Sequence, residues 1–410
     1  MKAKILIVGG GAMGTCIALH AAQRCDPLRE PVVLIEKDRL GAGSSGRTAA
    51  IVHQGYSERA MASMARDAVK VYAGLKSATG RSVGYRKTGV LILADMRNPQ
   101  SVAQLERDIE MQSSLAIDVR RVGAEEIHSL VPGIEVLDEA VGAWQPAGGF
   151  VDPGRAIQVF AGLARDRGAI TRIGVKQPSV LVENGHAVGV QTSEGTFHAP
   201  NVVLATGPWT PGILSELGIE LPLVLARTQE TFLRMPEPEI VEEDDLDLAE
   251  SSHSGLETRF VLDPLDLMPV AHPVVIDLGQ DFHARCEPAH CRTRFGQNNL
   301  DGLKEYASLE DLPDSVDPDF AARMRAAVTE RMPSYRDLED LGSQVSWITL
   351  TPDRRPIVGP VDAVPGLFVV AGFSGNDFQL APSIGEGLAQ MIVGQPVSAF
   401  DPEFFSLRRF

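Results

Sequence analysis

The chain has 410 residues and a formal net charge of −16 at pH 7, with 44% hydrophobic and 22% charged residues. Such an acidic chain repels nucleic acid and anionic lipid surfaces, which excludes both as its main partners. Its length suffices for two sizeable cores, and its composition is that of an ordinary globular protein.

The N-terminal pattern predicts a buried strand at 4–8, a glycine turn, a helix over 12–24 and a second strand at 32–36. Residues 5–23 carry no formal charge and resemble a signal peptide or a short membrane span, but three consecutive glycines interrupt them. A strand, a turn and a helix explain the stretch better, so we expect a cytoplasmic protein.

The glycine turn has the spacing of a dinucleotide-binding motif, Gly9-x-Gly11-x-x-Gly14, between a strand and a helix. Its glycines let backbone N–H groups approach a pyrophosphate, and the helix N-terminus attracts negative charge. Glu36 ends the second strand, where a carboxylate can accept hydrogen bonds from both ribose hydroxyls. The motif alone does not distinguish NAD from FAD.

A loop rich in glycine and serine follows at 40–48 and includes Ser44, Ser45, Arg47 and Thr48. Its hydroxyls, flexible backbone and guanidinium suit the second phosphate and the ribityl chain of FAD. A plain surface loop with a solvated arginine fits these residues equally well.

The middle of the chain alternates helical and strand patterns. Asp152 and Pro153 form an N-cap and first helical position, and the helix they begin runs to about residue 166. Asn184-Gly185 predicts a hairpin turn, and a third strand and a returning buried strand complete a meander over 179–205. Other expected elements are a helix at 57–77, a strand pair or one long strand at 83–94, and a helix at 100–113.

Residues 221–300 are expected to form mixed strands and loops, and the very acidic stretch at 236–250 to be a solvated loop. A helix at 320–331, a strand at 367–372 and a helix at 381–393 complete the pattern. Two glycine-rich segments, 352–360 and 372–379, lie around that last strand, and the second leads into the final helix. Backbone N–H groups there would stabilise the negative charge of a reduced flavin.

Cysteines give no sign of a metal site. Cys286 and Cys291 flank His290, but a second ligand pair is missing, so we expect free thiols and no metal.

These motifs together resemble the D-amino-acid oxidase superfamily of FAD enzymes, in the branch of glycine oxidase, the sarcosine oxidase β subunit and dye-linked proline dehydrogenase. The resemblance runs from Lys4 to about Gly394 and includes, in order, Gly9–Gly14 with Glu36, Ser44–Arg47, Thr88–Leu91, Gly149–Pro153, Ala205–Trp209, Thr351–Asp353 and Gly372–Gly375. It implies an α/β fold with a discontinuous Rossmann-type FAD-binding domain (1–80, 150–220 and 342–410) and an antiparallel-sheet α+β substrate domain (81–149 and 221–341).

The resemblance also implies roles for individual residues. The ADP half of FAD would be held by Gly9, Gly11, Ala12, Met13, Gly14, Glu36 and Lys37, with Val175, Thr206 and Gly207 completing the nucleotide pocket. The pyrophosphate and ribityl chain would be held by Ser44, Ser45, Arg47 and Thr48. The flavin edge would be lined by Gly372, Gly375, Asn376, Asp377, Phe378 and Gln379.

Some positions depart from the family pattern. Gln379 stands where sarcosine oxidases commonly have a lysine for the substrate carboxylate, and His53 where an arginine is often found. Arg285 is a replacement candidate, as are Arg292 and Arg294; each is also consistent with a salt bridge. Some relatives bind the flavin through a cysteine just before the Thr351–Asp353 motif, but residues 347–350 contain none, so we expect non-covalent FAD.

The resemblance implies oxidation of the C–N bond of a small amino acid or amine by hydride transfer to flavin N5, followed by imine hydrolysis. His53, Tyr56 and His283 are candidates for proton handling.

No lysine occurs between Lys176 and Lys304, which favours a dehydrogenase over an oxidase. The acceptor would be a quinone, an electron-transfer protein or O2, and the chain a possible subunit of a hetero-oligomer. The alternatives are 2-hydroxy-acid oxidation, a catalytically silent FAD-bound subunit or assembly factor, and an NAD-dependent dehydrogenase.

Overall fold

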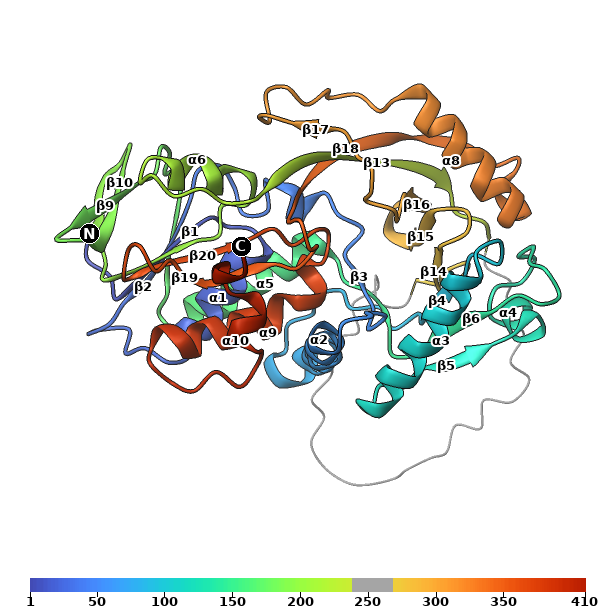
Figure 1. Ribbon diagram of the computed structural model, residues 1–410, viewed down its shortest axis with the longest axis horizontal. Helices are drawn as coiled ribbons and strands as arrows, with labels where there is room; N and C mark the ends of the chain where they lie inside the picture. The colour runs from blue at the N-terminus through green and yellow to red at the C-terminus, as the bar shows by residue number, and fades with distance from the viewer. Residues whose placement is uncertain (238–267) are drawn as a thin grey trace.

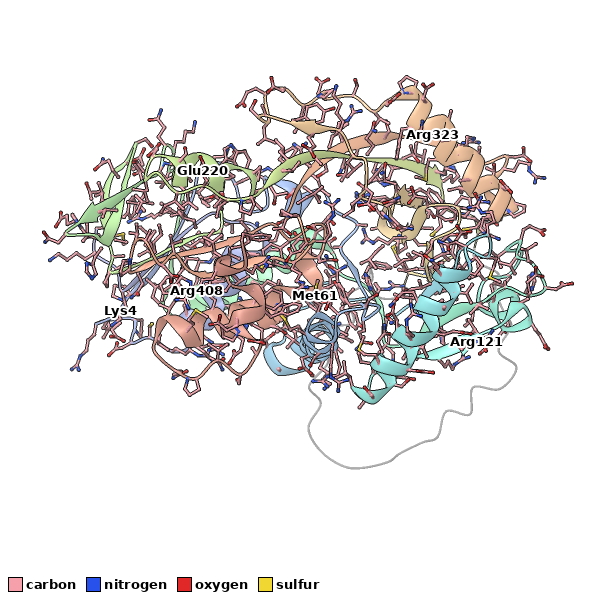
Figure 2. The ribbon with its side chains drawn as sticks, viewed as in Figure 1. Lys4, Met61, Arg121, Glu220, Arg323 and Arg408 are labelled. Atoms are coloured by element: carbon pink, nitrogen blue, oxygen red, sulfur yellow. The ribbon has the colours of Figure 1, made fainter. Side chains whose placement is uncertain are left out.

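The computed structural model describes residues 1–237 and 268–410. It has two lobes, each built on one large β-sheet, and the long strands β13 and β18 extend over both (Figure 1). Figure 2 shows charged side chains such as Arg121 and Arg323 towards the periphery. No helix in these two stretches is long and apolar enough to cross a membrane. The acidic segment at 236–250 falls almost wholly outside the described residues.

The N-terminal lobe contains a six-stranded sheet in the order β19-β20-β12-β1-β2-β8. All neighbouring pairs are parallel except β19 and β20. The strands are β1 (Ile5–Val8), β2 (Val32–Glu36), β8 (Ile170–Ile173), β12 (Asn201–Leu204), β19 (Ile357–Pro360) and β20 (Leu367–Ala371). Nearly continuous apolar sequence in β1, β2 and β20 is what a parallel sheet covered on both faces requires.

Side chains of β1 alternate between two apolar layers. Ile5 and Ile7 pack with the helices, whereas Leu6 and Val8 face the layer that contains the three-stranded meander. The helical layer comprises α1 (Ala12–Ala22), α2 (Arg59–Thr79), α5 (Pro153–Asp166) and α9 (Asp377–Ile392). The meander comprises β9 (Ser179–Glu183), β10 (His186–Thr192) and β11 (Gly195–His198).

The second lobe contains a nine-stranded, mostly antiparallel sheet in the order β17-β13-β16-β15-β14-β4-β6-β5, with β18 also paired to β13. Helix α8 (Pro318–Arg331) buries Phe320, Met324 and Val328 against one face. The strands are β4 (Val90–Leu93), β5 (Arg120–Val122), β6 (Gly142–Gln145), β13 (Val224–Arg234), β14 (Val274–Asp277), β15 (Phe282–Glu287), β16 (Arg292–Gly296), β17 (Glu305–Tyr306) and β18 (Asp340–Leu350).

The remaining elements are short or peripheral. Helices α3 (Pro99–Ser114) and α4 (Ala124–Leu130) lie beside the large sheet (Figure 1). The others are β3 (Ile51–Val52), which pairs with β7 (Gly149–Phe150), and α6 (Thr210–Ser215) and α10 (Pro402–Phe405).

One expected element needs correction, and one expected boundary falls inside a strand. The strand expected over 83–94 is reduced to β4, because Gly84 and Gly89 adopt positive φ and only Arg86 makes an isolated bridge, to Phe150. The domain boundary expected at 342 falls inside β18, which pairs with β13 along most of its length. We therefore propose that the C-terminal part of the FAD-binding domain begins after Leu350.

Candidate active site at a dinucleotide-binding turn

The turn between β1 and α1 brings backbone atoms too close together for any side chain. Gly9 has a φ of +111°, and a Cβ there would lie 2.3 Å from the Ala205 carbonyl oxygen. A Cβ on Gly14 would lie 1.8 Å from the Gly9 carbonyl oxygen. Gly11 is the N-cap of α1 and supplies no side-chain cap, so the positive end of the helix is open to an anion.

The carboxylate of Glu36 is held at the end of β2 by backbone donors. Gly10 N–H donates to Oε2 at 2.7 Å, and Asp38 N–H donates to Oε1 at 2.9 Å. Val175 lies beside it, with its N–H bonded to the Glu36 carbonyl at 3.0 Å. Lys37 places its ammonium 3.3 Å from the centre of the Trp209 ring. These residues lie together at the carboxyl end of β2, beside the glycine turn.

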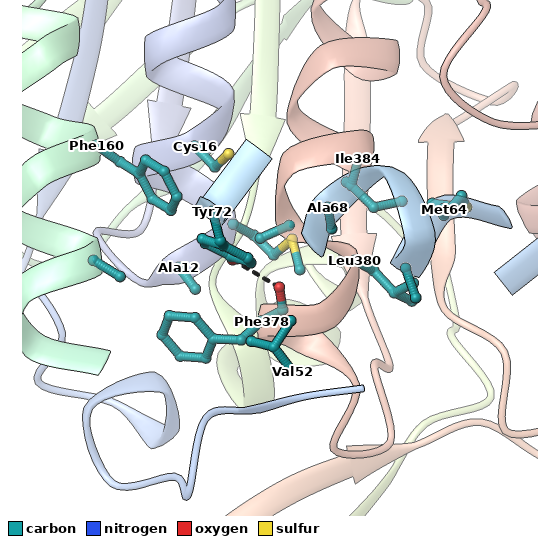
Figure 3. Close-up of a cluster of buried hydrophobic side chains, with 14 of the residues drawn as sticks. Ala12, Cys16, Val52, Met64, Ala68, Tyr72, Phe160, Phe378, Leu380 and Ile384 are labelled. Carbon is teal, nitrogen blue, oxygen red and sulfur yellow. Dashed lines mark hydrogen bonds between the residues drawn. The ribbon is translucent and has the colours of Figure 1, made fainter. Parts of the chain in front are cut away.

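The N-terminus of α9, although far away in the sequence, lies close to the N-terminus of α1. Ser45 Oγ accepts from Ala12 N–H at 3.3 Å and donates to Asp377 Oδ2 at 3.2 Å, which joins α1, the 40–48 loop and α9. Behind this contact, Tyr72 of α2 donates to the Phe378 carbonyl at 2.7 Å within a buried apolar cluster (Figure 3). Packing therefore fixes the position of the helix N-terminus.

A cavity of about 400 Å³ extends from this junction to the face of the large sheet. Besides His283, thirteen of the predicted residues line it. They are Gly11, Met13, Ser44, Ser45, Arg47, Thr48, His53, Gly207, Gly372, Gly375, Asn376, Asp377 and Gln379. Segments from the N-terminal and C-terminal parts of the chain and the 40–48 loop thus surround one cavity.

Comparison with known proteins identifies the family of the chain. A sequence model of the family described as FAD dependent oxidoreductase matches residues 4–391. The chain belongs to this family. FAD is accordingly its cofactor. The glycine turn between β1 and α1, the N-terminus of α1 and Glu36 fit the ADP moiety.

Several relatives share nearly the whole chain at low identity. 4-Methylaminobutanoate oxidase (formaldehyde-forming) of Paenarthrobacter nicotinovorans is 26% identical over 99% of this chain and 45% of its own length. Human peroxisomal sarcosine oxidase is 24% identical over 99% of this chain and 95% of its own length. The chain spans less than half the length of the first curated relatives it matches.

Solved structures confirm the fold. The crystal structure of L-proline dehydrogenase from P. horikoshii superposes with a TM-score of 0.82 at 24% identity and covers 100% of this chain and 98% of that chain. Glycine oxidase from Geobacillus kaustophilus superposes with a TM-score of 0.78 at 20% identity, covering 100% of this chain and 99% of that chain. The predicted two-part α/β architecture is confirmed.

The predicted residues outside the cavity wall fall into two groups. Most are neighbours of lining residues or lie around the glycine turn and the end of β2: Gly9, Ala12, Gly14, Glu36, Lys37, Val175, Thr206, Phe378 and Tyr56. Tyr56 is buried, and its hydroxyl bonds to Asn376 Oδ1 at 3.2 Å, so it positions the start of α9. Arg285 forms the second group, because a charge network holds it away from the cavity.

That network pairs the three arginines predicted as carboxylate anchors with two carboxylates. Arg285 donates to Glu287 at 2.9 Å, Arg292 donates to Glu287 at 2.7 Å, and Arg294 pairs with both Glu287 and Glu230. Burial lowers the pKa of Arg285 to about 10. None of these three guanidiniums lines the cavity, although Arg285 Nε has no hydrogen-bond partner among the described residues.

The sequence patterns did not indicate the roof of the cavity, which the large sheet supplies. This roof includes Thr228, Gln229, Glu230, Ile276, Gly296, Asn298 and Ser346–Thr349. Its strands read as ordinary alternating β-structure, and only strand pairing brings their side chains to one face. His283, a proton-handling candidate, also belongs to this roof.

Two uncharged imidazoles face the cavity. Burial lowers the pKa of His53 to about 4, and burial likewise lowers the pKa of His283 to about 4. His53 Nδ1 accepts from Gly55 N–H at 3.1 Å, which leaves the proton on its Nε2. Both rings are neutral at physiological pH, so this part of the site carries hydrogen-bonding groups without added charge.

Proposed function

We propose that this protein oxidises the C–N bond of a small amino acid or secondary amine, such as a sarcosine-, glycine- or proline-like compound, with non-covalent FAD. Bound FAD would accept a hydride at N5, and the imine product would be hydrolysed. The observation that carries the proposal is a single cavity that joins the nucleotide turn to two neutral imidazoles on the sheet roof.

The protein's own groups would orient the amine and exclude water. The sheet roof closes the cavity over the N-terminus of α9, and Gln379 and His53 contribute polar atoms to the wall. A strong side-chain base is unnecessary when the amine binds uncharged. Relatives named for oxidation of methylated amines, including dimethylglycine dehydrogenase and sarcosine oxidase, support this substrate class.

The electron acceptor forms the second part of the proposal. We favour a dehydrogenase that passes electrons to a quinone or an electron-transfer protein in the cytoplasm, because no lysine occurs between Lys176 and Lys304. Hydrogen peroxide formed in proportion to consumed substrate would instead establish an oxidase.

Anaerobic titration of the purified protein tests the reaction. The panel contains amino acids, N-methylated amino acids, cyclic amines and 2-hydroxy acids, and flavin absorbance is the readout. We expect bleaching by an amine. Bleaching by hydroxy acids alone would replace the proposal with hydroxy-acid oxidation, and no bleaching would indicate a silent subunit, a role compatible with the 26% identity to a pyruvate dehydrogenase phosphatase regulatory subunit of Mus musculus.

A further inference from the structure

The cavity roof contains a hydrogen-bond acceptor without a partner. Nε2 of His283 is excluded from solvent and has no hydrogen bond to any residue in the described parts of the chain. Trp347 Nε1 is also unpartnered, but its ring packs edge-on against Trp209 on the nucleotide side. A buried polar atom left without a partner costs free energy, so a ligand that completes it is favoured.

The surroundings of Asn298 determine which nitrogen of His283 carries the proton. The Asn298 amide donates to the Asp277 carbonyl at 3.1 Å and to the Phe282 carbonyl at 2.6 Å. Its oxygen therefore faces His283 Nδ1 at 3.2 Å and can only accept. Nδ1 bears the hydrogen, and Nε2 presents a bare lone pair.

The His283 ring packs against a glycine of the neighbouring strand. Glu230, Gly296, His283 and Ile276 are directly paired across β13, β16, β15 and β14, so they share one face of the sheet and line the cavity together. A Cβ on Gly296 would lie 2.9 Å from His283 Nε2. The absent side chain therefore makes room for the imidazole at the edge of the cavity that His283 and Gly296 both line.

Burial is the main reason that the ring stays uncharged, and its charged neighbours add to this effect. Arg285 and Arg294 occupy the next register position on the same face and disfavour an imidazolium, as does His53 from the loop after β3. Glu230 approaches from β13, but Arg294 neutralises it. A neutral acceptor close to two guanidiniums favours a donor that carries no charge of its own, because a further positive charge there would be repelled.

We propose that His283 Nε2 accepts a hydrogen bond from the N–H of the substrate's reacting amine, which binds uncharged. This inference rests on the proposed function and identifies the residue that orients the nitrogen. No covalent bond forms or breaks at the imidazole. Asn298 is a positioning residue that acts through His283.

Equilibrium binding of two amines that cannot be oxidised tests the proposal. The probes are 2-aminoisobutyrate and tert-butylamine, which have no hydrogen on the carbon next to nitrogen, and the readout is the absorbance change of FAD in the holoenzyme. We expect at least one to bind, and His283→Phe to weaken its binding about tenfold, the loss of one hydrogen bond. His283→Gln, which retains an acceptor, should stay within about threefold.

His290→Phe is the matched control, because His290 is exposed in the turn between β15 and β16. It should leave binding unchanged. The FAD content and melting temperature of each variant separate a binding effect from misfolding. Failure of both probes to bind the wild-type protein, or equal binding by His283→Phe, would overturn the proposal.

The pH profile distinguishes orientation from a purely structural role. Asn298→Asp still accepts from Nδ1–H but stabilises the imidazolium, so amine binding should be lost at a higher pH than in wild type. An unchanged profile would contradict the role of Asn298. Binding of the probes needs no turnover. Binding that depends on His283, without bleaching of the flavin by any substrate, would therefore refute only the proposed reaction. Bleaching that His283→Phe does not affect would refute only this inference.

Discussion

Asp377 places a carboxyl group in the cavity wall at the N-terminus of α9. Burial raises its pKa to about 6, although Ser45 and backbone donors partly oppose this. The same wall contains Gly11, Ser44 and Ser45, where the anionic pyrophosphate is expected. The carboxyl and the cofactor phosphates should therefore repel each other whenever Asp377 is ionised.

We predict that FAD binds more weakly as the pH rises from about 6 to 8, by up to about tenfold per pH unit, because binding favours the protonated carboxyl. Asp377→Asn should remove this dependence and tighten binding at pH 8. Fluorescence titration of the apoprotein with FAD measures both effects. A flat profile in the wild-type protein would refute the prediction.

Capping residues determine where the helices of the FAD-binding lobe begin. Asp152 accepts from Arg155 N–H at 2.7 Å, and Pro153 takes the first helical position of α5. The helix then buries Ile157 and Phe160 in the layer shared with α1 and α9. A local sequence signal thus positions a helix that supports the dinucleotide turn.

Asp152→Ala should destabilise the protein by about 1 kcal/mol, since one N–H of the first turn loses its partner. Asp152→Asn retains the cap and should stay within a few tenths of a kcal/mol of wild type. Urea denaturation followed by circular dichroism measures the difference. Equal losses in both variants would show that the charge of Asp152, and not its cap, matters.

Across the whole molecule, a buried ion network stands where the large sheet meets the FAD-binding lobe. Arg285 lies over the Phe150 ring, and Arg294 donates to the Arg47 carbonyl at 3.3 Å. Burial alone would raise the pKa of Glu287, but Arg294 and Arg285 outweigh it and lower that pKa to about 2. The network therefore links ionisation to the stability of the two-lobed structure.

A depressed carboxylate pKa contributes stability above the unfolded pKa of 4.5 and loses it as the pH falls towards about 2. We expect Glu287 to supply about 3 kcal/mol at pH 7 by this linkage. Glu287→Gln should lower the unfolding free energy by about 3–5 kcal/mol at pH 7, because it leaves buried arginines unpaired. Near pH 2.5 the gap to wild type should narrow; a constant gap in denaturation experiments would contradict the network's role.

Local sequence determined the nucleotide end of this protein. Short backbone distances exclude a side chain at Gly9 and Gly14, and Glu36 stands at the end of a strand. Asp152 caps a helix, and Asn184-Gly185 forms a turn. Each of these features can be predicted from a few neighbouring residues. Tertiary structure alone decided the substrate end. Glu230, Gly296 and His283 lie side by side because three separate strands pair in one register. Arg285 pairs with Glu287 on the same face of its strand and does not line the cavity. Register depends on long-range packing, which no local pattern encodes.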